Sequence, residues 1–307
     1  MKYLVTGGAG FIGSNIVEGL LKRGQSVRVL DNFSTGKREN IQHALDKIEL
    51  IEGDIRSYHI VREAVEDIDV ILHQAALPSV PRSIRDPITT NDVNVGGTLN
   101  ILDAAKDEKV KRVVMASSSS IYGDTSELLK NEKMRPNPLS PYAVSKLAGE
   151  KYCSVFSRLN GLHTIALRYF NVFGPKQDPN SQYSAVIPKF IKAILNNEMP
   201  VIYGDGEQSR DFTYVENVVD ANILASTADC EPGLAMNLGC SEQTTLNLLV
   251  EEIDSILRKN IHAVYEKARP GDVKHSLADI SLIKQKLGYV PRVHFHEGLN
   301  MTIANYV

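Results

Sequence analysis

The sequence contains few cysteines. Only Cys153, Cys230 and Cys240 occur in 307 residues, an odd number without the short spacings that zinc ligands show. We therefore expect neither a structural metal nor a disulfide framework, and we interpret all three as reduced thiols without a role in chemistry.

Long apolar runs and an excess of one charge are also missing. No segment approaches the roughly 18 apolar residues of a membrane span, and the first residues lead into a predicted strand rather than a secretory signal. We expect a cytoplasmic protein. A net charge of −3, spread over both signs, gives no basis for binding nucleic acid or a membrane surface. The expected partner is a small molecule.

A glycine-rich segment near the N-terminus is the first motif that is present. A short apolar strand at residues 2–6 precedes Gly7-Gly-Ala-Gly10-Phe-Ile-Gly13, and a helical pattern follows at residues 15–22. Glycines between a strand and a helix let backbone N–H groups approach a pyrophosphate at the helix N-terminus. The motif predicts a dinucleotide site, although glycines with this spacing also occur in purely structural turns.

Asp31 follows a second predicted strand at residues 25–30. A carboxylate at this place can accept the hydroxyls of an adenosine ribose and would repel a 2′-phosphate, which favours NAD over NADP. Two alternatives stay open: Asp31 could cap a helix, and the nearby cations Lys37 and Arg38 could accommodate NADP.

Strands and helices alternate through the first half of the chain. We predict further strands at residues 48–52, 70–76, 111–117 and 164–169, with helices at residues 61–66 and 94–105. This order is typical of an α/β fold with a doubly wound parallel sheet. His73 lies inside an apolar strand, where a hydrogen-bonded core residue is more common than a catalytic base. Without repeats or a proline-rich linker, a second region should pack on the first.

Tyr142 and Lys146 are spaced to share one face of a helix. Ser140 and Pro141 have the properties of an N-cap and a first helical residue. On such a helix the ammonium of Lys146, together with the positive charge of a cofactor, could lower a tyrosine pKa that is ordinarily about 10 and so make Tyr142 a base. A solvated pair without function would show the same spacing.

Polar residues elsewhere could complete a site. Residues 117–120 are four serines at the carboxyl end of a predicted strand, where ligands bind in such sheets, although a serine run can also be a simple turn. Arg210 and Arg269 are candidates for a diphosphate clamp because guanidinium groups bind phosphate in a bidentate way. Each alone could equally be a surface arginine.

Taken together, these motifs resemble the extended short-chain dehydrogenase/reductases. The glycine turn, Asp31, Asp54, the serine run, Tyr142-x-x-x-Lys146 and the segment 167–171 occur in that order. Within that superfamily the chain looks like the nucleotide-sugar 4-epimerases that act on UDP-galactose and UDP-N-acetylglucosamine. The resemblance implies a Rossmann domain at residues 1–174 that binds NAD, with the chain returning to it around 208–240. A smaller α/β region at residues 175–307 would bind mainly the UDP-sugar.

The resemblance also implies a mechanism. NAD would stay tightly bound and be recycled while Tyr142 takes the proton from the sugar O4 and C4 gives up a hydride. Ser118 would hydrogen-bond O4, and Lys146 would hold the nicotinamide ribose and lower the tyrosine pKa. The 4-keto sugar would then turn over and take the hydride back on its other face.

By the same resemblance, further residues contact each ligand. The cofactor contacts would be Gly7, Gly10, Phe11, Ile12, Gly13, Asp31, Asn32, Ser34, Gly36, Asp54, Ile55, Ala75, Ala76, Asn94, Tyr142 and Lys146. The substrate contacts would be Ser79, Ser118, Ser120, Asn171, Arg210, Arg269, Asp272 and Ser276. Ser276 aligns where members restricted to non-acetylated sugars carry a tyrosine, so a pocket roomy enough for an N-acetyl group is implied.

Related activities on the same fold remain as alternatives. A UDP-glucuronate 4-epimerase would share most of these motifs, and a nucleotide-sugar reductase would release its NAD(P) in each cycle. A dehydratase would need acids where Ser119 and Ser120 stand, and a non-catalytic NAD sensor would generally lack Tyr142 or Lys146. Family habit suggests a homodimer through helices around residues 94–105 and 145–156, and no metal is implied.

Overall fold

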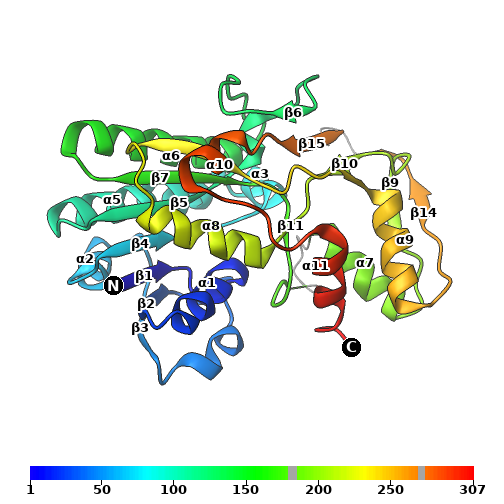
Figure 1. Cartoon of the computed structure of the whole chain (residues 1–307), viewed down its shortest axis with the longest axis horizontal. Coiled ribbons are helices and arrows are strands. Elements are labelled where there is room, and N and C mark those ends of the chain that lie inside the picture. Colours follow the sequence, from blue (N-terminus) through cyan, green and yellow to red (C-terminus); the bar gives the residue numbers. More distant parts are fainter. Residues whose placement is uncertain (179–184, 269–273) are drawn as a thin grey trace.

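A parallel sheet of seven strands forms the centre of the molecule. The computed structural model describes residues 1–178, 185–268 and 274–307 (Figure 1). The strand order is β12-β7-β5-β4-β1-β2-β3, and every neighbouring pair is parallel. The strands are β1 (Lys2–Thr6), β2 (Ser26–Asp31), β3 (Ile48–Glu52), β4 (Val70–His73), β5 (Arg112–Ser118), β7 (Thr164–Tyr169) and β12 (Leu234–Leu238). The doubly wound α/β fold predicted from the sequence is confirmed.

Helices cover both faces of this sheet and bury two apolar cores. One face packs against α1 (Phe11–Lys22) and α8 (Val215–Thr227), and the other against α2 (Tyr58–Val65), α5 (Gly97–Asp107) and α6 (Pro141–Asn160). Side chains alternate along each strand, so Tyr3 and Val5 enter one core and Leu4 the other. Burial on both faces explains why these strands are continuous apolar runs.

The strand order reverses between β1 and β4. β2 and β3 follow on one side of β1, whereas β4, β5, β7 and β12 follow on the other. Loops leaving the carboxyl ends of β1 and β4 therefore diverge, and the crevice between them is where doubly wound sheets bind their ligands. A short helix α3 (Val80–Arg85) and α4 (Pro87–Asn91) lie beyond β4, and a π-helical turn (Asp92–Gly96) joins α4 to α5. The predicted helix at residues 94–105 is thus the second part of a longer helical segment.

A second region is built on short strands. One sheet has the order β13-β10-β15-β6. Its strands are β6 (Leu129–Lys130), β10 (Ser209–Arg210), β13 (Thr244–Thr245) and β15 (His275–Ala278). The remaining pairs are β8 (Val172–Phe173) with β11 (Thr213–Tyr214) and β9 (Val201–Tyr203) with β14 (Val264–Glu266). The other helices are α7 (Val186–Leu195), α9 (Leu246–Leu257), α10 (Ser281–Leu287) and α11 (Phe295–Ile303).

The two regions are joined at a buried carboxylate. Asp211 accepts hydrogen bonds from the backbone N–H groups of Cys240 (2.8 Å), Ser241 (2.9 Å) and Ala278 (3.1 Å). Burial raises the pKa of Asp211 to about 6, and the three donors offset part of that effect. The contact links the segment after β10 to the ends of β12 and β15. Within the described ranges, none of the helices has the length and apolarity that crossing a bilayer requires.

Candidate active site

The glycine turn joins β1 to α1 at the reversal point of the sheet. A Cβ atom on Gly13 would lie 2.1 Å from the carbonyl oxygen of Gly7, closer than any side chain can approach. Gly7 itself has a φ of +68°, and a Cβ there would lie 2.8 Å from the backbone of Ala75. Only glycine fits either position. The turn therefore leaves the N-terminus of α1 open to the crevice, as binding of a pyrophosphate requires.

Asp31 ends β2 directly beside this turn. Its carboxylate accepts the N–H groups of Ala9 (2.9 Å) and Phe33 (2.8 Å), so it does not cap a helix. Burial raises its pKa, and these hydrogen bonds lower it in part. Each carboxylate oxygen keeps acceptor capacity for a ribose hydroxyl.

The two cations that could favour NADP have acidic partners. Lys37 pairs with Asp178 at 3.0 Å, and Arg38 pairs with Glu52 and lies over the ring of Phe33. Because these charges are matched within the chain, they give little support to a 2′-phosphate site.

The edge near the carboxyl end of β3 carries the next group of predicted cofactor contacts. Asn32 donates to Asp54 at 2.8 Å, and hydrogen bonds from Arg56 lower the pKa of Asp54 to about 2. Ile55 is buried and Ser34 is exposed at the same edge. An ionised acid and an apolar side chain thus lie side by side, which suits a polar ring bound against an apolar surface.

Asn94 holds the loop after β4 against α6. Its side chain accepts the N–H of Leu77 (2.7 Å) and donates to the Leu77 carbonyl (3.2 Å) and to Ser145 (3.0 Å). The N–H of Ala75 in the same loop donates to Thr6 on β1. These bonds connect the glycine turn, the loop and α6. The amide of Asn94 is largely used in this way, and its contact with a cofactor remains a prediction.

Ser79 ends that loop in an unusual conformation. It has a φ of +107°, rare for a residue with a side chain, and its hydroxyl accepts the N–H of Arg82 as the N-cap of α3. Backbone strain of this kind often marks a functional site. The position fits the predicted substrate contact without testing it.

Tyr142 and Lys146 lie on one face of α6, as predicted. Ser140 caps this helix by accepting the N–H of Ala143, and Pro141 is its first residue. Ser118 at the end of β5 lies close enough to Tyr142 to lower the pKa of its phenol. Lys146 is buried and donates to the carbonyl oxygen of Ala116 at 2.9 Å. Phenol, hydroxyl and ammonium therefore meet at the carboxyl end of β5.

The chain by itself does not lower the pKa of Tyr142, and the predicted lowering counted on the charge of a bound cofactor as well as on Lys146. Burial raises the pKa of Tyr142, and Ser118 lowers it only in part. Lys146 lies 6.0 Å from the centre of the tyrosine ring, and burial lowers its own pKa to about 8. The spacing along the helix correctly predicts that Tyr142 and Lys146 share a face. It does not report how far burial of both groups shifts their pKa values.

The four serines have different surroundings. Ser117 is buried and donates to Glu150, whereas Ser118 contacts Tyr142. The hydroxyl of Ser120 is buried and has no hydrogen-bond partner within the part of the chain that the structure describes. A buried hydroxyl of this kind is available to a ligand. Ser118 and Ser120 therefore suit their predicted roles better than Ser117 does.

His73 is a core residue, as expected. It is 3% exposed, and its ring nitrogens bond the hydroxyls of Thr6 (2.7 Å) and Thr98 (3.0 Å). Burial lowers its pKa to about 3, so the ring is neutral at physiological pH. With both nitrogens occupied it is not available as a base.

Two of the predicted substrate contacts, Arg210 and Ser276, lie on the four-stranded sheet. Strand pairing sets Arg210 on β10 directly beside Ser276 on β15, and Arg210 donates to the carbonyls of Ser209 and Lys274. Asn171 is exposed after β7, where its carbonyl accepts the N–H of Thr213. The two further predicted contacts, Arg269 and Asp272, lie outside the described residues.

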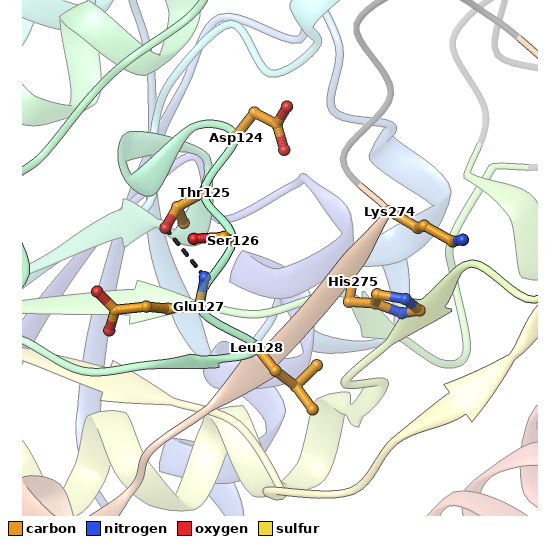
Figure 2. A pocket seen from close by; sticks show the side chains of 7 residues that line it. All are labelled: Asp124, Thr125, Ser126, Glu127, Leu128, Lys274 and His275. Carbon is orange, nitrogen blue, oxygen red and sulfur yellow. Dashed lines mark hydrogen bonds between the residues drawn. The ribbon is translucent and has the colours of Figure 1, made fainter.

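A cavity of about 470 Å³ lies at the outer edge of this sheet. Figure 2 shows its two walls, the loop of residues 124–128 and the beginning of β15 with Lys274 and His275. Neither Tyr142 nor the glycine turn lines it, so it is not the catalytic centre. Ser276 follows His275 on β15 and is not among the lining residues.

Comparisons with known proteins show which protein family the chain belongs to. Residues 3–239 match the model of the NAD dependent epimerase/dehydratase family. The chain belongs to this family. A putative UDP-glucose 4-epimerase from Methanocaldococcus jannaschii is 38% identical over 302 residues, which are 98% of this chain and 96% of that protein. A UDP-glucuronate 4-epimerase from Thermodesulfobacterium geofontis is 34% identical and matches 98% of this chain and 94% of its own.

Solved structures of epimerases superpose over nearly the full length. A UDP-N-acetylglucosamine 4-epimerase from Methanobrevibacter ruminantium, in complex with UDP-N-acetylmuramic acid, has a TM-score of 0.95 and 43% identity, covering 99% of this chain and 97% of its own. A Thermus thermophilus UDP-glucose 4-epimerase in complex with NAD has a TM-score of 0.91 and 36% identity, covering 100% and 99%.

NAD is the cofactor of this epimerase/dehydratase family, and the chain fits it. A turn in which two glycines leave no space for a Cβ lies beside a carboxylate at the end of β2, in the crevice of the sheet. Gly7, Gly10 and Gly13 would receive the pyrophosphate, Asp31 the adenosine ribose, and Lys146 the nicotinamide ribose. These individual contacts remain predictions.

The sequence motifs did not single out Glu150 and Arg168, which lie next to the candidate site. Glu150 and Arg168 are buried directly behind Lys146 and Ser117 and form an ion pair at 2.9 Å. The spacing could have indicated Glu150, because it follows Lys146 by four residues just as Lys146 follows Tyr142. A charged residue on the inner face of a helix needs a buried partner.

Proposed function

We propose that the protein is an NAD-dependent UDP-sugar 4-epimerase. It interconverts UDP-glucose with UDP-galactose, and UDP-GlcNAc with UDP-GalNAc, through a 4-keto sugar. The observation that carries this proposal is that Tyr142 and Lys146 of α6 lie with Ser118 at the carboxyl end of β5, where Lys146 donates to the carbonyl oxygen of Ala116 at 2.9 Å and Ser118 lowers the pKa of Tyr142. Relatives that match the chain end to end carry the name UDP-glucose 4-epimerase.

The residues of the chain divide the proton chemistry among them. Tyr142 removes the proton from the sugar O4 and later returns it, while Ser118 holds O4 and the phenol in line. Bound NAD would supply hydride transfer at C4, and the positive charge of its oxidised ring would favour the phenolate. Lys146 adds a second positive charge, its ammonium lying 6.0 Å from the centre of the tyrosine ring. Together they offset the burial that raises the pKa of Tyr142.

Acetylated sugars belong to the proposed substrates because of Ser276. Strand pairing places this small residue next to Arg210, a proposed contact of the UDP diphosphate. A serine leaves room where a tyrosine would fill the space near C2 of the sugar. The Methanobrevibacter ruminantium relative, 43% identical, is named a UDP-N-acetylglucosamine 4-epimerase.

A uronic substrate is the second candidate. The Thermodesulfobacterium geofontis relative is named a UDP-glucuronate 4-epimerase, and two solved relatives are complexes with UDP-glucuronic acid or a fluorinated analogue. Elimination is disfavoured because Ser119 and Ser120 stand where a dehydratase needs acids. A reductase would release its cofactor in each cycle, so NAD that remains bound during purification argues against one.

The test is direct conversion without added cofactor. Purified protein is incubated with UDP-GlcNAc, UDP-glucose or UDP-glucuronate, and the C4 epimers are resolved by proton NMR. We expect conversion of the first two, and Tyr142→Phe should lower kcat for both by about 10²–10⁴-fold. Conversion of UDP-glucuronate alone would replace the proposed substrate, and no conversion of any of the three by protein that has lost its NAD would favour a reductase.

Ser276→Tyr tests the acetyl pocket separately. The larger side chain should abolish conversion of UDP-GlcNAc while conversion of UDP-glucose persists. Ser276→Ala is the matched control, since it keeps the space and removes only the hydroxyl. Equal conversion of both sugars by Ser276→Tyr would show that this position does not set the size of the pocket.

A further inference from the structure

One face of α6 extends beyond the two residues already assigned. Glu150 follows Lys146 by four residues, as Lys146 follows Tyr142, so all three point to the same side of the helix. The side chain of Glu150 is 4% exposed. A carboxylate so deeply buried requires strong hydrogen-bond donors.

Arg168 on β7 supplies those donors. Its Nε and Nη2 atoms each donate to one oxygen of Glu150 at 2.9 Å, a bidentate arrangement that fixes both planes. Ser117 donates a third hydrogen bond to the same carboxylate. Since Ser117 and Arg168 are paired in register on β5 and β7, the pair joins the helix to two strands at once.

Three successive turns of α6 thus lie against three successive residues of β5. Lys146 donates to the carbonyl of Ala116, Glu150 accepts from Ser117, and Tyr142 lies near Ser118, which lowers its pKa. Gly149 allows the close approach, because a Cβ there would lie 2.2 Å from the methyl group of Met115. The position of the phenol relative to Ser118 is therefore set partly by a bond two turns away.

Arg168 also connects, through two further side chains, to strands β6 and β15. Its Nη1 donates to the hydroxyl of Tyr122 (2.8 Å), which donates to the side-chain oxygen of Asn237 (2.6 Å). The amide of Asn237 donates to the carbonyls of Lys130 on β6 and Asp279 after β15. The ion pair therefore stands between Tyr142 and the strand that carries Ser276.

We propose that Glu150 and Arg168 are positioning residues for the reaction. They set the phenol of Tyr142 and the hydroxyl of Ser118 relative to the sugar, without touching either ligand. The proposal rests on the proposed function. Stability alone is a weak reason for such a pair, because a buried ion pair is commonly no more stable than apolar residues of similar size.

Single and double variants of Glu150 and Arg168 distinguish an effect on the geometry of the site from an effect on protein stability. Glu150→Gln and Arg168→Met each leave one buried charge without a partner, so both should unfold at lower urea concentration. The double variant contains neither charge and should recover most of that stability. If the pair positions the site, kcat of the double variant stays about 10²-fold below wild type with KM unchanged.

Arg28→Met is the matched control. Arg28 is also a buried arginine of the large sheet, 8% exposed in its side chain against 7% for Arg168, but it bonds carbonyls at the end of α2 and Glu49. This variant should lose stability and keep kcat per bound NAD. The proposal is overturned if the double variant regains kcat together with stability, or if Arg28→Met loses kcat equally.

A second measurement needs no substrate. The ultraviolet difference absorbance of the phenolate, taken between each protein and its Tyr142→Phe derivative, reports the titration of Tyr142. Loss of the effect of Ser118 should move that titration to higher pH in the double variant. An unchanged titration overturns the proposal. Turnover is scored with whichever UDP-sugar the wild type converts, so a wrong substrate assignment leaves the positioning test intact.

Discussion

Burial of His73 makes the folding stability of the protein depend on pH. Its folded-state pKa of about 3 lies below the ordinary 6.5, so the unfolded chain binds a proton that the folded chain does not. The stability that this provides is complete above pH 6.5 and is lost as the pH falls toward 3. The slope contributed by His73 approaches about 1.4 kcal/mol per pH unit.

Replacing the imidazole tests this argument. We expect His73→Gln to flatten the dependence of unfolding free energy on pH between about pH 6 and pH 4 by that amount per unit. Urea unfolding with excess NAD in every sample measures the slope. His59→Gln, at an exposed histidine, should keep the wild-type slope. If both variants behave alike, the imidazole of His73 ionises in the folded protein.

Residue types and spacing were enough to bring the proposed reacting groups together on one helix face but not to give their ionisation. Tyr142 and Lys146 could be placed on one helix face, and His73 in the core, because these follow from local periodicity. The raised pKa of Tyr142 comes from its burial in the assembled fold, which no local pattern reports. Glu150 and Arg168 were missed since their pairing joins residues 18 apart on different elements.

At the level of elements, the β1–α1 connection tolerates no side chain at Gly13. A methyl group there meets backbone rather than a movable side chain, so the turn must open by a cost of about 1–3 kcal/mol or more. We expect Gly13→Ala to purify without NAD, measured by absorbance of the nucleotide released on denaturation. Gly96→Ala, where a Cβ meets nothing within 4 Å, should retain it. Retention by both would remove the glycine turn from the cofactor site.

Elements with a clear period or cap were predicted well. The strands at residues 2–6, 48–52 and 164–169 have the predicted bounds, and α6 begins after Ser140 as its cap requires. Strands of two residues, such as β6 and β10, have no period to detect. The predicted strand at residues 70–76 ends at His73 because Asn94 draws the following loop away from the sheet.

At the level of the whole molecule, α6 presents an apolar stripe to the outside. Val144, Tyr152 and Leu159 are 53%, 36% and 71% exposed, and Ile84 and Ile88 on the adjacent α3 and α4 are 64% and 74% exposed. Apolar residues grouped in this way favour an interface with a second copy of the chain. The stripe includes the α6 side of the expected homodimer, and the part of residues 94–105 in that homodimer remains a prediction.

A charge in this stripe should separate the copies. We expect Val144→Glu to shift the molar mass measured by light scattering from dimer to monomer, because an unpaired charge would be buried in the interface. Val290→Glu, at a valine 64% exposed on another surface, should leave the mass unchanged. A wild-type protein that is itself a monomer would contradict the homodimer.

Contacts between residues far apart in the sequence could not be predicted from local patterns. Alternation of elements predicts a parallel sheet, and the return of α8 and β12 to that sheet agrees with apolar runs at both. The pairing of β6 with β15 joins residues nearly 150 positions apart, and Asp211 joins three segments through backbone donors. Such contacts depend on the assembled fold, and sequence spacing carries no trace of them.

The attachment of α6 to β5 also limits where the chain can change in length. Its three contacts share one helical phase, and a single residue inserted between Tyr142 and Glu150 would rotate everything after it by about 100°. Base, ammonium and carboxylate would then no longer face the same strand. Insertions in the loop at residues 124–128 leave that phase untouched. Relatives that differ in substrate should therefore vary in loop length on the β6 and β15 side and keep constant spacing along α6.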